Sequence, residues 1–265
     1  MSRQSRYLFI SAVAWAGFVA VTVWTVLFLA DVVVSPTVDG PPRTSAAVAA
    51  TVDLTLLMLF AVQHSAMARP QVKAWSRRHI PAPLERTSYV LATDACLLVI
   101  LVLWQPWGGQ VWQVHGPAGV VVWSLGMFGW ILAIASTFAV DHLELTGLRQ
   151  AGWSTPRDAV RTNRLEVGGL HAVVRHPLMT GLLLAFWATP HMGASHVLFA
   201  TAMTVYIAIG VRFEERDLRR TFADYDAYAA RVPALLPGLR LQTVRRSARR
   251  PRRASAAVAV DSQRT

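Results

Sequence analysis

The sequence is poor in cysteine and in charged residues. Cys96 is the only cysteine among 265 residues, so an intrachain disulfide is excluded, and so is a zinc or iron–sulfur site built on cysteines. Charged residues make up 15% of the chain, whereas a soluble domain usually carries about 25%. Walker A, HExxH and GxSxG patterns are absent, and no glycine-rich motif follows a predicted strand. The sequence therefore lacks the usual motifs of soluble nucleotide-binding and hydrolytic enzymes.

Hydrophobic residues are abundant instead, at 54% of the chain with a mean hydropathy of +0.37. A helix needs about 20 apolar residues to cross a bilayer, and the first apolar run is too long for a signal peptide. We therefore predict an all-α integral membrane protein with one domain over residues 1–240 and a disordered Arg-rich cytoplasmic tail over residues 241–265. The expected apolar segments are residues 7–34, 45–67, 87–104, 117–140, 178–189 and 195–211.

The last two apolar segments differ from the others. Residues 178–189 are too few to cross a hydrocarbon core of about 30 Å as a helix. The sequence Pro190-His191-Met192-Gly193 then interrupts the apolar run before it resumes at residue 195. This pattern predicts a tight helical hairpin whose short arm is covered by protein and whose second arm continues beyond the membrane to Phe222.

Basic residues are unevenly distributed, and the formal net charge is +11. If six spans place both termini in the cytoplasm, all of the 26 Lys and Arg residues except Arg43 lie on the cytoplasmic side. This distribution satisfies the positive-inside rule and favours contact with anionic lipids rather than with nucleic acid. We expect a multi-pass protein of a bacterial-type inner membrane, with an oligomeric state that the sequence leaves open.

Ionisable residues within apolar segments are costly and therefore of interest, and three of them stand out. Asp53 and Asp94 either pair with polar groups inside the bundle or contribute to a proton path. His64, in Gln63-His64-Ser65, is either a satisfied core histidine or a group that orients or deprotonates a small nucleophile.

A second polar group follows the fourth apolar segment. Asp141, His142 and Arg149 are close enough in sequence to line one cleft. The alternative is that they are ordinary polar residues of an exposed loop.

A third polar group flanks the C-terminal hairpin. His176 precedes Pro177, which favours the start of a helix whose N-terminus suits a carboxylate. On the other arm, Glu214 and Glu215 can accept hydrogen bonds from an ammonium group or from ribose hydroxyls. Adjacent helical residues point in different directions, so we expect one of the two to face a ligand. The alternative is pairing of the glutamates with Arg212, Arg216 and Arg219.

These motifs resemble a known family. Arg175-His176-Pro177 with Gly181, then Glu214-Glu215, Tyr225, Tyr228 and Arg231-Val232-Pro233 look like the isoprenylcysteine carboxyl and phospholipid methyltransferase superfamily. Upstream, Gln63-His64-Ser65, Glu85-Arg86-Thr87 with Tyr89-Val90, and residues 141–150 resemble its NnrU-like branch, and within it the membrane-bound methanethiol S-methyltransferases. The resemblance implies a helical fold that holds S-adenosylmethionine over the cytoplasmic side of the C-terminal hairpin and methylates a small volatile thiol to give dimethyl sulfide.

The resemblance also implies roles for individual residues, and no metal. We expect His64, His142, Asp141 and Arg149 to be catalytic, with a histidine as base, and the substrate to pass Gln63, Phe186 and Trp187. The residues expected to bind the cofactor are Arg175, His176, Gly181, Glu214, Glu215, Tyr225 and Arg231. Two alternatives stay open, namely a lipid or isoprenylcysteine methyltransferase and a non-enzymatic membrane accessory protein. Leu178-Met179 and Leu182 argue against a sterol-type reductase.

Overall fold

A computed structural model describes residues 2–154, 165 and 167–238. Five of its helices are long and apolar enough to cross a membrane, and α7 is a shorter apolar helix. The predicted all-α membrane fold is therefore confirmed, whereas the predicted tail lies outside the described residues. The helices are α1 (Arg3–Leu29), α2 (Ala46–Ala68), α3 (Pro70–His79), α4 (Glu85–Leu103), α5 (Gly116–Val140), α6 (His142–Thr146), α7 (Pro177–Trp187), α8 (Ala194–Thr221) and α9 (Tyr225–Arg231), with turns η1 (Ala82–Leu84) and η2 (Gly169–Ala172) and strands β1 (Gln110–Gln113) and β2 (His191–Gly193).

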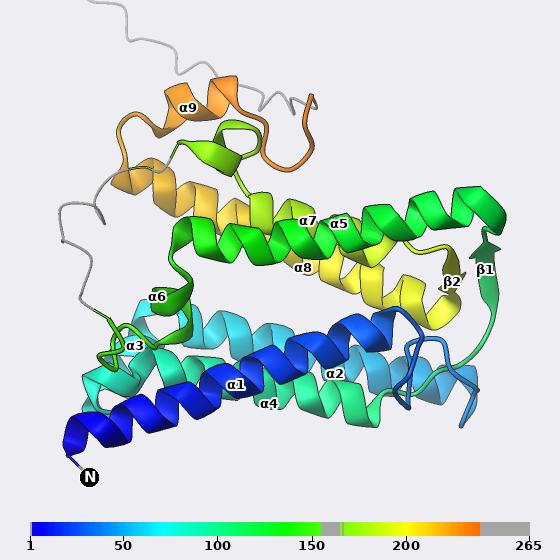
Figure 1. Ribbon diagram of the computed structural model, residues 1–265, viewed down its shortest axis with the longest axis horizontal. Coiled ribbons are helices and arrows are strands. Elements are labelled where there is room, and N and C mark those ends of the chain that lie inside the picture. Colours follow the sequence, from blue (N-terminus) through cyan, green and yellow to red (C-terminus); the bar gives the residue numbers. More distant parts are fainter. Residues whose placement is uncertain (1, 155–164, 166, 239–265) are drawn as a thin grey trace, which may run out of the picture.

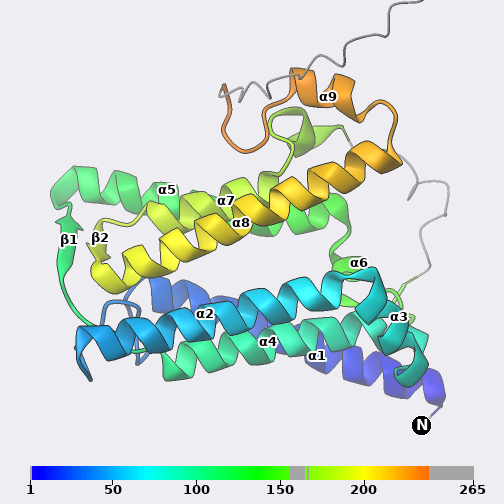
Figure 2. The same cartoon turned by 180° about the vertical axis from the view of Figure 1, so that it is seen from behind.

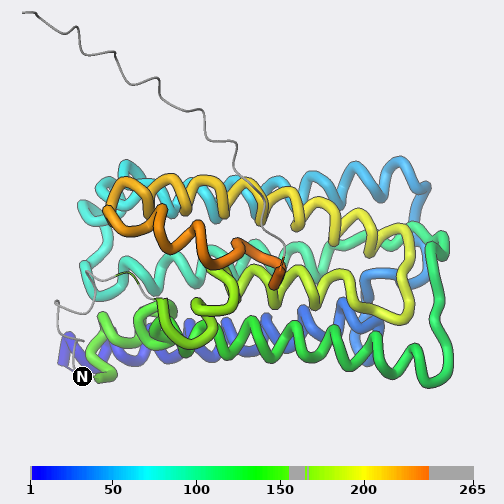
Figure 3. The backbone as a smooth tube through the Cα atoms, turned by 90° about the horizontal axis from the view of Figure 1, so that it is seen from above, coloured from blue at the N-terminus to red at the C-terminus, as the bar shows by residue number. Residues whose placement is uncertain are grey.

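The long helices form two layers. Helices α1, α2 and α4 make one layer and α5, α7 and α8 the other, as Figures 1 and 2 show from opposite sides. Helices α2 and α8 contact each other between the layers, and all six run along the same long axis (Figure 3). The N-terminus, α3 and α6 lie at one end of the bundle, here named the α6 end, and the two strands lie at the opposite end.

Small residues bring α5 and α7 into close contact. A Cβ atom built on Gly181 would lie 2.5 Å from the backbone nitrogen of Ala133, and one on Gly129 would lie 2.6 Å from that of Ala185. Backbones that approach this closely gain dispersion contacts that larger side chains would prevent. In α7 only Trp187 is exposed. The prediction of a short arm covered by protein is therefore confirmed.

The end opposite α6 holds a feature that the sequence analysis did not predict. Strands β1 and β2 pair antiparallel, whereas the sequence predicts helices alone. Nearby, Asp39 accepts hydrogen bonds from the backbone nitrogens of Gly193 at 2.6 Å and His196 at 3.1 Å. A carboxylate from a distant loop thus satisfies the first N–H groups of α8. Both features depend on pairing across long sequence separations, which no local pattern reveals.

Candidate functional site

Three of the sequence motifs meet at the C-terminal part of the fold. Arg175 donates a hydrogen bond through Nε to Glu215 Oε1 at 2.9 Å and forms a second, shorter one through Nη2. Arg219, one turn further along α8, donates to Glu215 Oε2 at 3.0 Å. The side chains of Arg175 and Glu215 are each only 11% exposed. This buried ion pair, with His176, Glu214 and Arg219, is here named the arginine cluster.

His176 lies between the two glutamates of the cluster. Its Nδ1 is 3.4 Å from Glu214 Oε2, and its Nε2 is 3.4 Å from Glu215 Oε1. Burial alone would lower the pKa of His176, but the hydrogen bonds and charges of Glu214 and Glu215 outweigh it and raise the pKa to about 9. The imidazole therefore carries a positive charge at neutral pH, beside the N-terminus of α7.

The two glutamates differ in how exposed their carboxylates are. Glu215 is buried and its carboxylate is used by the arginine cluster, whereas the side chain of Glu214 is 52% exposed. That one of the two faces a ligand stays a prediction, and Glu214 has the more exposed carboxylate. The alternative reading, pairing with an arginine of the same helix, holds for Glu215 and Arg219.

The segment after α9 folds back over the start of α7. The backbone nitrogens of Arg175 and His176 donate to the carbonyls of Pro233 and Ala234 at 2.9 and 3.0 Å. Thr180 Oγ1 donates to Leu235 O at 2.6 Å. Arg175 also donates to backbone carbonyls at Ala229 and Val232. The motif around Arg231-Val232-Pro233 therefore positions the N-terminus of α7 through its backbone.

Three residues predicted to bind the cofactor have structural partners of their own. Tyr225 is buried against the guanidinium of Arg219, whose carbon lies 5.5 Å from the ring centroid. Arg231 is exposed, and its Nε donates to Ala227 O within α9. Gly181 faces α5, as described above. A cofactor contact for each of these residues stays a prediction.

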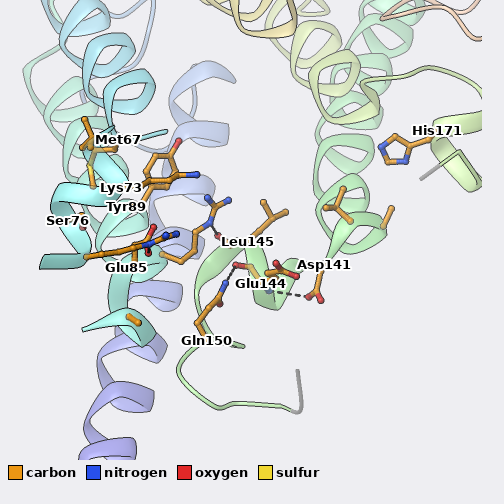
Figure 4. Close-up of a pocket in the computed structure, with 16 residues that line it drawn as sticks. Met67, Lys73, Ser76, Glu85, Tyr89, Asp141, Glu144, Leu145, Gln150 and His171 are labelled. Atoms are coloured by element: carbon orange, nitrogen blue, oxygen red, sulfur yellow. Dashed lines mark hydrogen bonds and ion pairs between the residues drawn. The ribbon is translucent and has the colours of Figure 1, made fainter. Parts of the chain in front are cut away.

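A polar cavity of about 900 Å³ lies at the α6 end, where the ends of the two layers meet. Figure 4 shows Met67, Glu85 and Tyr89 from α2 and α4 on one side, with Asp141 and His171 on the other. Of the residues that the sequence predicted for the site, only Asp141 lines it. The lining residues are Met67, Val72, Lys73, Ser76, Arg77, Ala82, Glu85, Arg86, Tyr89, Ala139, Val140, Asp141, Glu144, Leu145, Gln150 and His171.

Asp141 and Arg149 form an ion pair beside this cavity. Arg149 Nε lies 2.9 Å from Asp141 Oδ2, and its Nη2 donates to Oδ1 at 3.2 Å. Asp141 Oδ1 also accepts from the backbone nitrogen of Glu144 at 3.1 Å and so caps α6. The carboxylate thus fixes the turn that joins α5 to α6. Asp141 lines the cavity, and its predicted part in catalysis stays a prediction.

The structure turns His142 away from the cavity, so the expectation that it lines the same cleft as Asp141 is wrong. Trp15 Nε1, which only donates, is 2.9 Å from His142 Nε2, and Thr137 Oγ1 is 2.9 Å from Nδ1. The ring stacks on Phe138, with a centroid distance of 4.4 Å. Burial lowers the pKa of His142, against an opposing effect of the Asp141 charge. Both ring nitrogens already have partners, so His142 joins α6 to α1 and α5.

His64 lies behind the cavity wall rather than in it. Its Nε2 is 2.7 Å from Tyr89 Oη, and its Nδ1 is 3.3 Å from Thr93 Oγ1. Tyr89, in contrast, lines the cavity. Gln63 Nε2 donates to Met67 Sδ at 3.1 Å, and Met67 lines the cavity as well. Both Gln63 and His64 therefore reach the cavity through a neighbouring side chain.

The predicted substrate residues Phe186 and Trp187 lie elsewhere. Phe186 is buried among Trp130 and Phe199, with ring centroids 6.0 and 5.2 Å away. It lies roughly 14 Å along α7 from Pro177, at 1.5 Å per residue. Trp187 Nε1 donates to Thr204 Oγ1 at 2.9 Å. Neither residue lines the cavity at the α6 end, so a substrate contact for them stays a prediction.

The two intramembrane aspartates behave differently. Asp53 Oδ1 accepts from the backbone nitrogen of Gln105 at 2.9 Å, as one of the two readings expects. Asp94 is buried, and neither of its carboxylate oxygens has a hydrogen-bond partner within the described part of the chain. It faces Gly17 of α1, where an added Cβ would lie 3.6 Å from Asp94 Oδ2.

Sequence reasoning missed most of the cavity wall. Tyr89 appeared only as part of a family motif, and Lys73, Arg86 and Gln150 were not assigned a role. These residues come from α3, α4 and the segment after α6, and nothing local in the sequence indicates that they converge. The one available signal was the position of polar residues at the ends of apolar segments that share one side of the membrane.

Fold and site together define a multi-pass helical membrane protein with a polar cavity at one end of its bundle. A buried ion-pair cluster also ties its last membrane hairpin together. The chain belongs to the NnrU protein family, whose model matches residues 54–258.

Several curated proteins are similar to this chain over most of its length. Methanethiol S-methyltransferase 2 of Bradyrhizobium diazoefficiens is 40% identical over 254 residues, which are 95% of this chain and 98% of that protein. Methanethiol S-methyltransferase of Pseudomonas deceptionensis is 44% identical over 217 residues, 79% and 81% of the two chains. Its namesake of Mycobacterium tuberculosis is 40% identical over 238 residues, 88% and 98%. No solved structure matches the chain significantly.

Proposed function

We propose that this protein is a membrane methyltransferase that transfers a methyl group from S-adenosylmethionine to methanethiol and releases dimethyl sulfide. The observation that carries the proposal is the 40% identity to Methanethiol S-methyltransferase 2 over 95% of this chain. The aligned part leaves out only about 5% of this chain, so the similarity extends over most of its described helices.

The chemistry of the residues present fits the proposed cofactor. S-adenosylmethionine carries an ammonium group, a carboxylate and a sulfonium, so its site needs groups of both signs. The cavity wall includes the acidic residues Glu85, Asp141 and Glu144 and the basic residues Lys73, Arg77 and Arg86. Its volume of about 900 Å³ lies within the range of about 300–1,000 Å³ typical of small-molecule sites.

Residues of the arginine cluster would hold the amino-acid part of the cofactor. The exposed carboxylate of Glu214 suits the ammonium group. The positive charge of His176 and the N-terminus of α7 suit the carboxylate. Glu215 and Arg175 would position these groups rather than contact the cofactor, because their mutual ion pair fixes His176 and the start of α7.

The protein's own contribution to the reaction is alignment and deprotonation. When bound, the sulfonium supplies an already activated methyl group, so the main tasks are an in-line approach and a thiolate nucleophile. A thiol is largely protonated at neutral pH, so a proton acceptor close to the cavity accelerates the reaction. The apolar lining of Met67, Val140 and Leu145 suits a small alkyl group.

The proposal includes an orientation in an inner membrane. Arg3 in α1, Lys73 in α3 and Arg216 near the end of α8 belong to elements that lie at or reach the α6 end, whereas Arg43 lies in the loop at the opposite end. Basic residues mark the cytoplasmic side of membrane proteins. The α6 end, with the cavity and the arginine cluster, would then face the cytoplasm, where S-adenosylmethionine is made.

The test uses the purified full-length protein in detergent with S-adenosylmethionine and methanethiol. Dimethyl sulfide in the headspace and S-adenosylhomocysteine in solution, formed in equal amounts, are the expected products. Glu214→Gln should weaken cofactor binding measured by calorimetry, because it removes the negative charge opposite the ammonium group. Cofactor binding without dimethyl sulfide would overturn the choice of acceptor and direct the search to lipid or isoprenylcysteine acceptors. No cofactor binding at all would refute the methyltransferase proposal.

A further inference from the structure

Tyr89 is placed between the cavity and His64. Its hydroxyl lies 2.7 Å from His64 Nε2, a short distance for a hydrogen bond to nitrogen. Tyr89 lines the cavity and His64 does not. Within the part of the chain that the structure describes, the Tyr89 hydroxyl therefore joins His64 to the cavity wall.

The imidazole of His64 is held in this position from several sides. Thr93 Oγ1 lies 3.3 Å from Nδ1, on the opposite side of the ring from Tyr89. Phe60 stacks on the ring at a centroid distance of 5.3 Å. With Nδ1–H directed at Thr93, Nε2 is the nitrogen that accepts a proton. The ring is thus fixed in an orientation suited to receive a proton from Tyr89.

The surroundings of Tyr89 combine charge with a small apolar space. The guanidinium carbon of Arg86 lies 5.2 Å from the centroid of the Tyr89 ring, and Arg86 Nε donates to Leu145 O at 2.9 Å. Met67 and Leu145 line the same cavity. The other charged groups of the wall are Lys73, Arg77, Glu85, Asp141 and Glu144.

We propose that the Tyr89 side of the cavity is the thiol subsite, and that Tyr89 and His64 form a proton relay that removes the thiol proton. This inference rests on the proposed function. The thiol S–H proton passes to Tyr89 Oη while the Tyr89 hydroxyl proton passes to His64 Nε2. The thiolate sulfur forms the new S–C bond to the methyl group, and the electron pair of the broken bond stays on the donor sulfur. His64 then returns its proton to water through the same hydroxyl.

The relay assigns different parts to the two residues. Tyr89 contacts the substrate and is the catalytic residue. His64 acts through Tyr89 and is the proton acceptor behind it, and Thr93 positions the ring. This arrangement explains how a histidine outside the cavity wall serves a reaction inside the cavity.

The test compares methanethiol with methaneselenol as acceptors. The two have nearly the same shape, but the selenol is ionised at neutral pH and needs no base. Tyr89→Phe keeps the ring and removes the hydroxyl. Its kcat with methanethiol should fall about 100-fold, the lower range for loss of general-base catalysis, whereas its kcat with methaneselenol should stay within about threefold of the wild type. His64→Ala should show the same contrast, and the double variant should lose little more than either single one.

Tyr206→Phe is the matched control. It removes a hydroxyl from the other tyrosine beside His64, one that bonds Ser65 at 3.3 Å and does not line the cavity. We expect it to keep wild-type rates with both acceptors. Cofactor binding by calorimetry shows whether Tyr89→Phe is folded.

Equal losses of Tyr89→Phe with methanethiol and methaneselenol, or full activity with both, would overturn the relay. These outcomes are distinct from failure of the proposed function, in which the wild-type protein itself forms no dimethyl sulfide. If Tyr89→Phe does not fold, Thr93→Val offers a second variant that perturbs the relay from behind His64. Thr93→Val should lower kcat with methanethiol more than with methaneselenol, and equal effects would again refute the relay.

Discussion

Replacement of Glu215 by glutamine should strongly destabilise the fold, because this carboxylate contacts three side chains and ties the segment before α7 to α8. It accepts hydrogen bonds from Arg175, which precedes α7, and from Arg219 in α8, and it lies 3.4 Å from His176 Nε2. The Arg175 guanidinium is 11% exposed and would keep its charge without a counterion. Uncompensated buried charge is the costly consequence of the change.

The magnitude follows from the burial of this pair. Loss of one partner of a buried ion pair costs about 3–5 kcal/mol. Glutamine retains one acceptor oxygen, and Arg219 is 35% exposed and can reach solvent, so we expect the lower end, about 3 kcal/mol. For a chain of this size that corresponds to a fall in Tm of about 6–12 °C. Thermal unfolding in detergent, followed by tryptophan fluorescence, measures it.

Glu214→Gln provides the matched control. The two positions are adjacent, and the substitution is the same, but the Glu214 side chain is 52% exposed. An exposed ion pair contributes about 0–1 kcal/mol, so Glu214→Gln should lower Tm less than Glu215→Gln does. Cofactor binding should show the reverse order. Glu214→Gln should weaken it more than Glu215→Gln does, because Glu214 is the residue proposed to contact the ammonium group. Equal shifts in Tm for both variants would refute the assignment of a structural role to Glu215 and an open position to Glu214.

Three further predictions follow from the geometry. The pKa of His176 is raised from 6.5 to about 9. Protonated His176 therefore stabilises the fold by about 3 kcal/mol at most, fully below pH 6.5, and this stabilisation is lost as the pH rises through 9. Measurement of Tm from pH 6 to 10 tests this. Gly181→Ala should cost about 1–3 kcal/mol because it overpacks the contact with α5, whereas Gly210→Ala, with open space around it, should stabilise α8 by about 0.5–1 kcal/mol, both measured by chemical unfolding. His142→Ala should lower Tm while kcat with methanethiol stays within about threefold of the wild type, because His142 faces α1 rather than the cavity.

Each of these three has a contrary outcome. A His176→Asn variant should lose the pH dependence between pH 6.5 and 9, and persistence of that dependence would place its origin in another group. Equal effects of alanine at Gly181 and Gly210 would contradict the close backbone contact. A large loss of kcat in His142→Ala at unchanged Tm and cofactor affinity would restore the catalytic role that the sequence suggested.

The membrane helices were predictable because their signal is local. A span needs a continuous apolar run of sufficient length, and the ends of α2, α4, α5 and α8 lie within a few residues of the predicted ends. The short arm, α7, followed from its length and from the Pro190 to Gly193 interruption. The paired strands were missed because β1 and β2 are short and their partners lie far apart in the chain.

The candidate site was predictable only in part. The Arg175-His176 and Glu214-Glu215 motifs do meet, as the family resemblance implies, but they meet by bonding to one another. His64 and His142 look alike in the sequence as histidines near the ends of apolar segments. The fold directs one towards a tyrosine of the cavity wall and the other towards Trp15.

The sequence by itself determined that this is a helical membrane protein and where most of its long apolar helices lie, because these properties depend on hydrophobic runs. The tertiary structure alone decided which glutamate is buried, which histidine adjoins the cavity and that Tyr89 separates His64 from it. These outcomes depend on the rotation of each helix about its axis and on partners from distant segments. Such orientations are set by packing between helices, which a single sequence does not display.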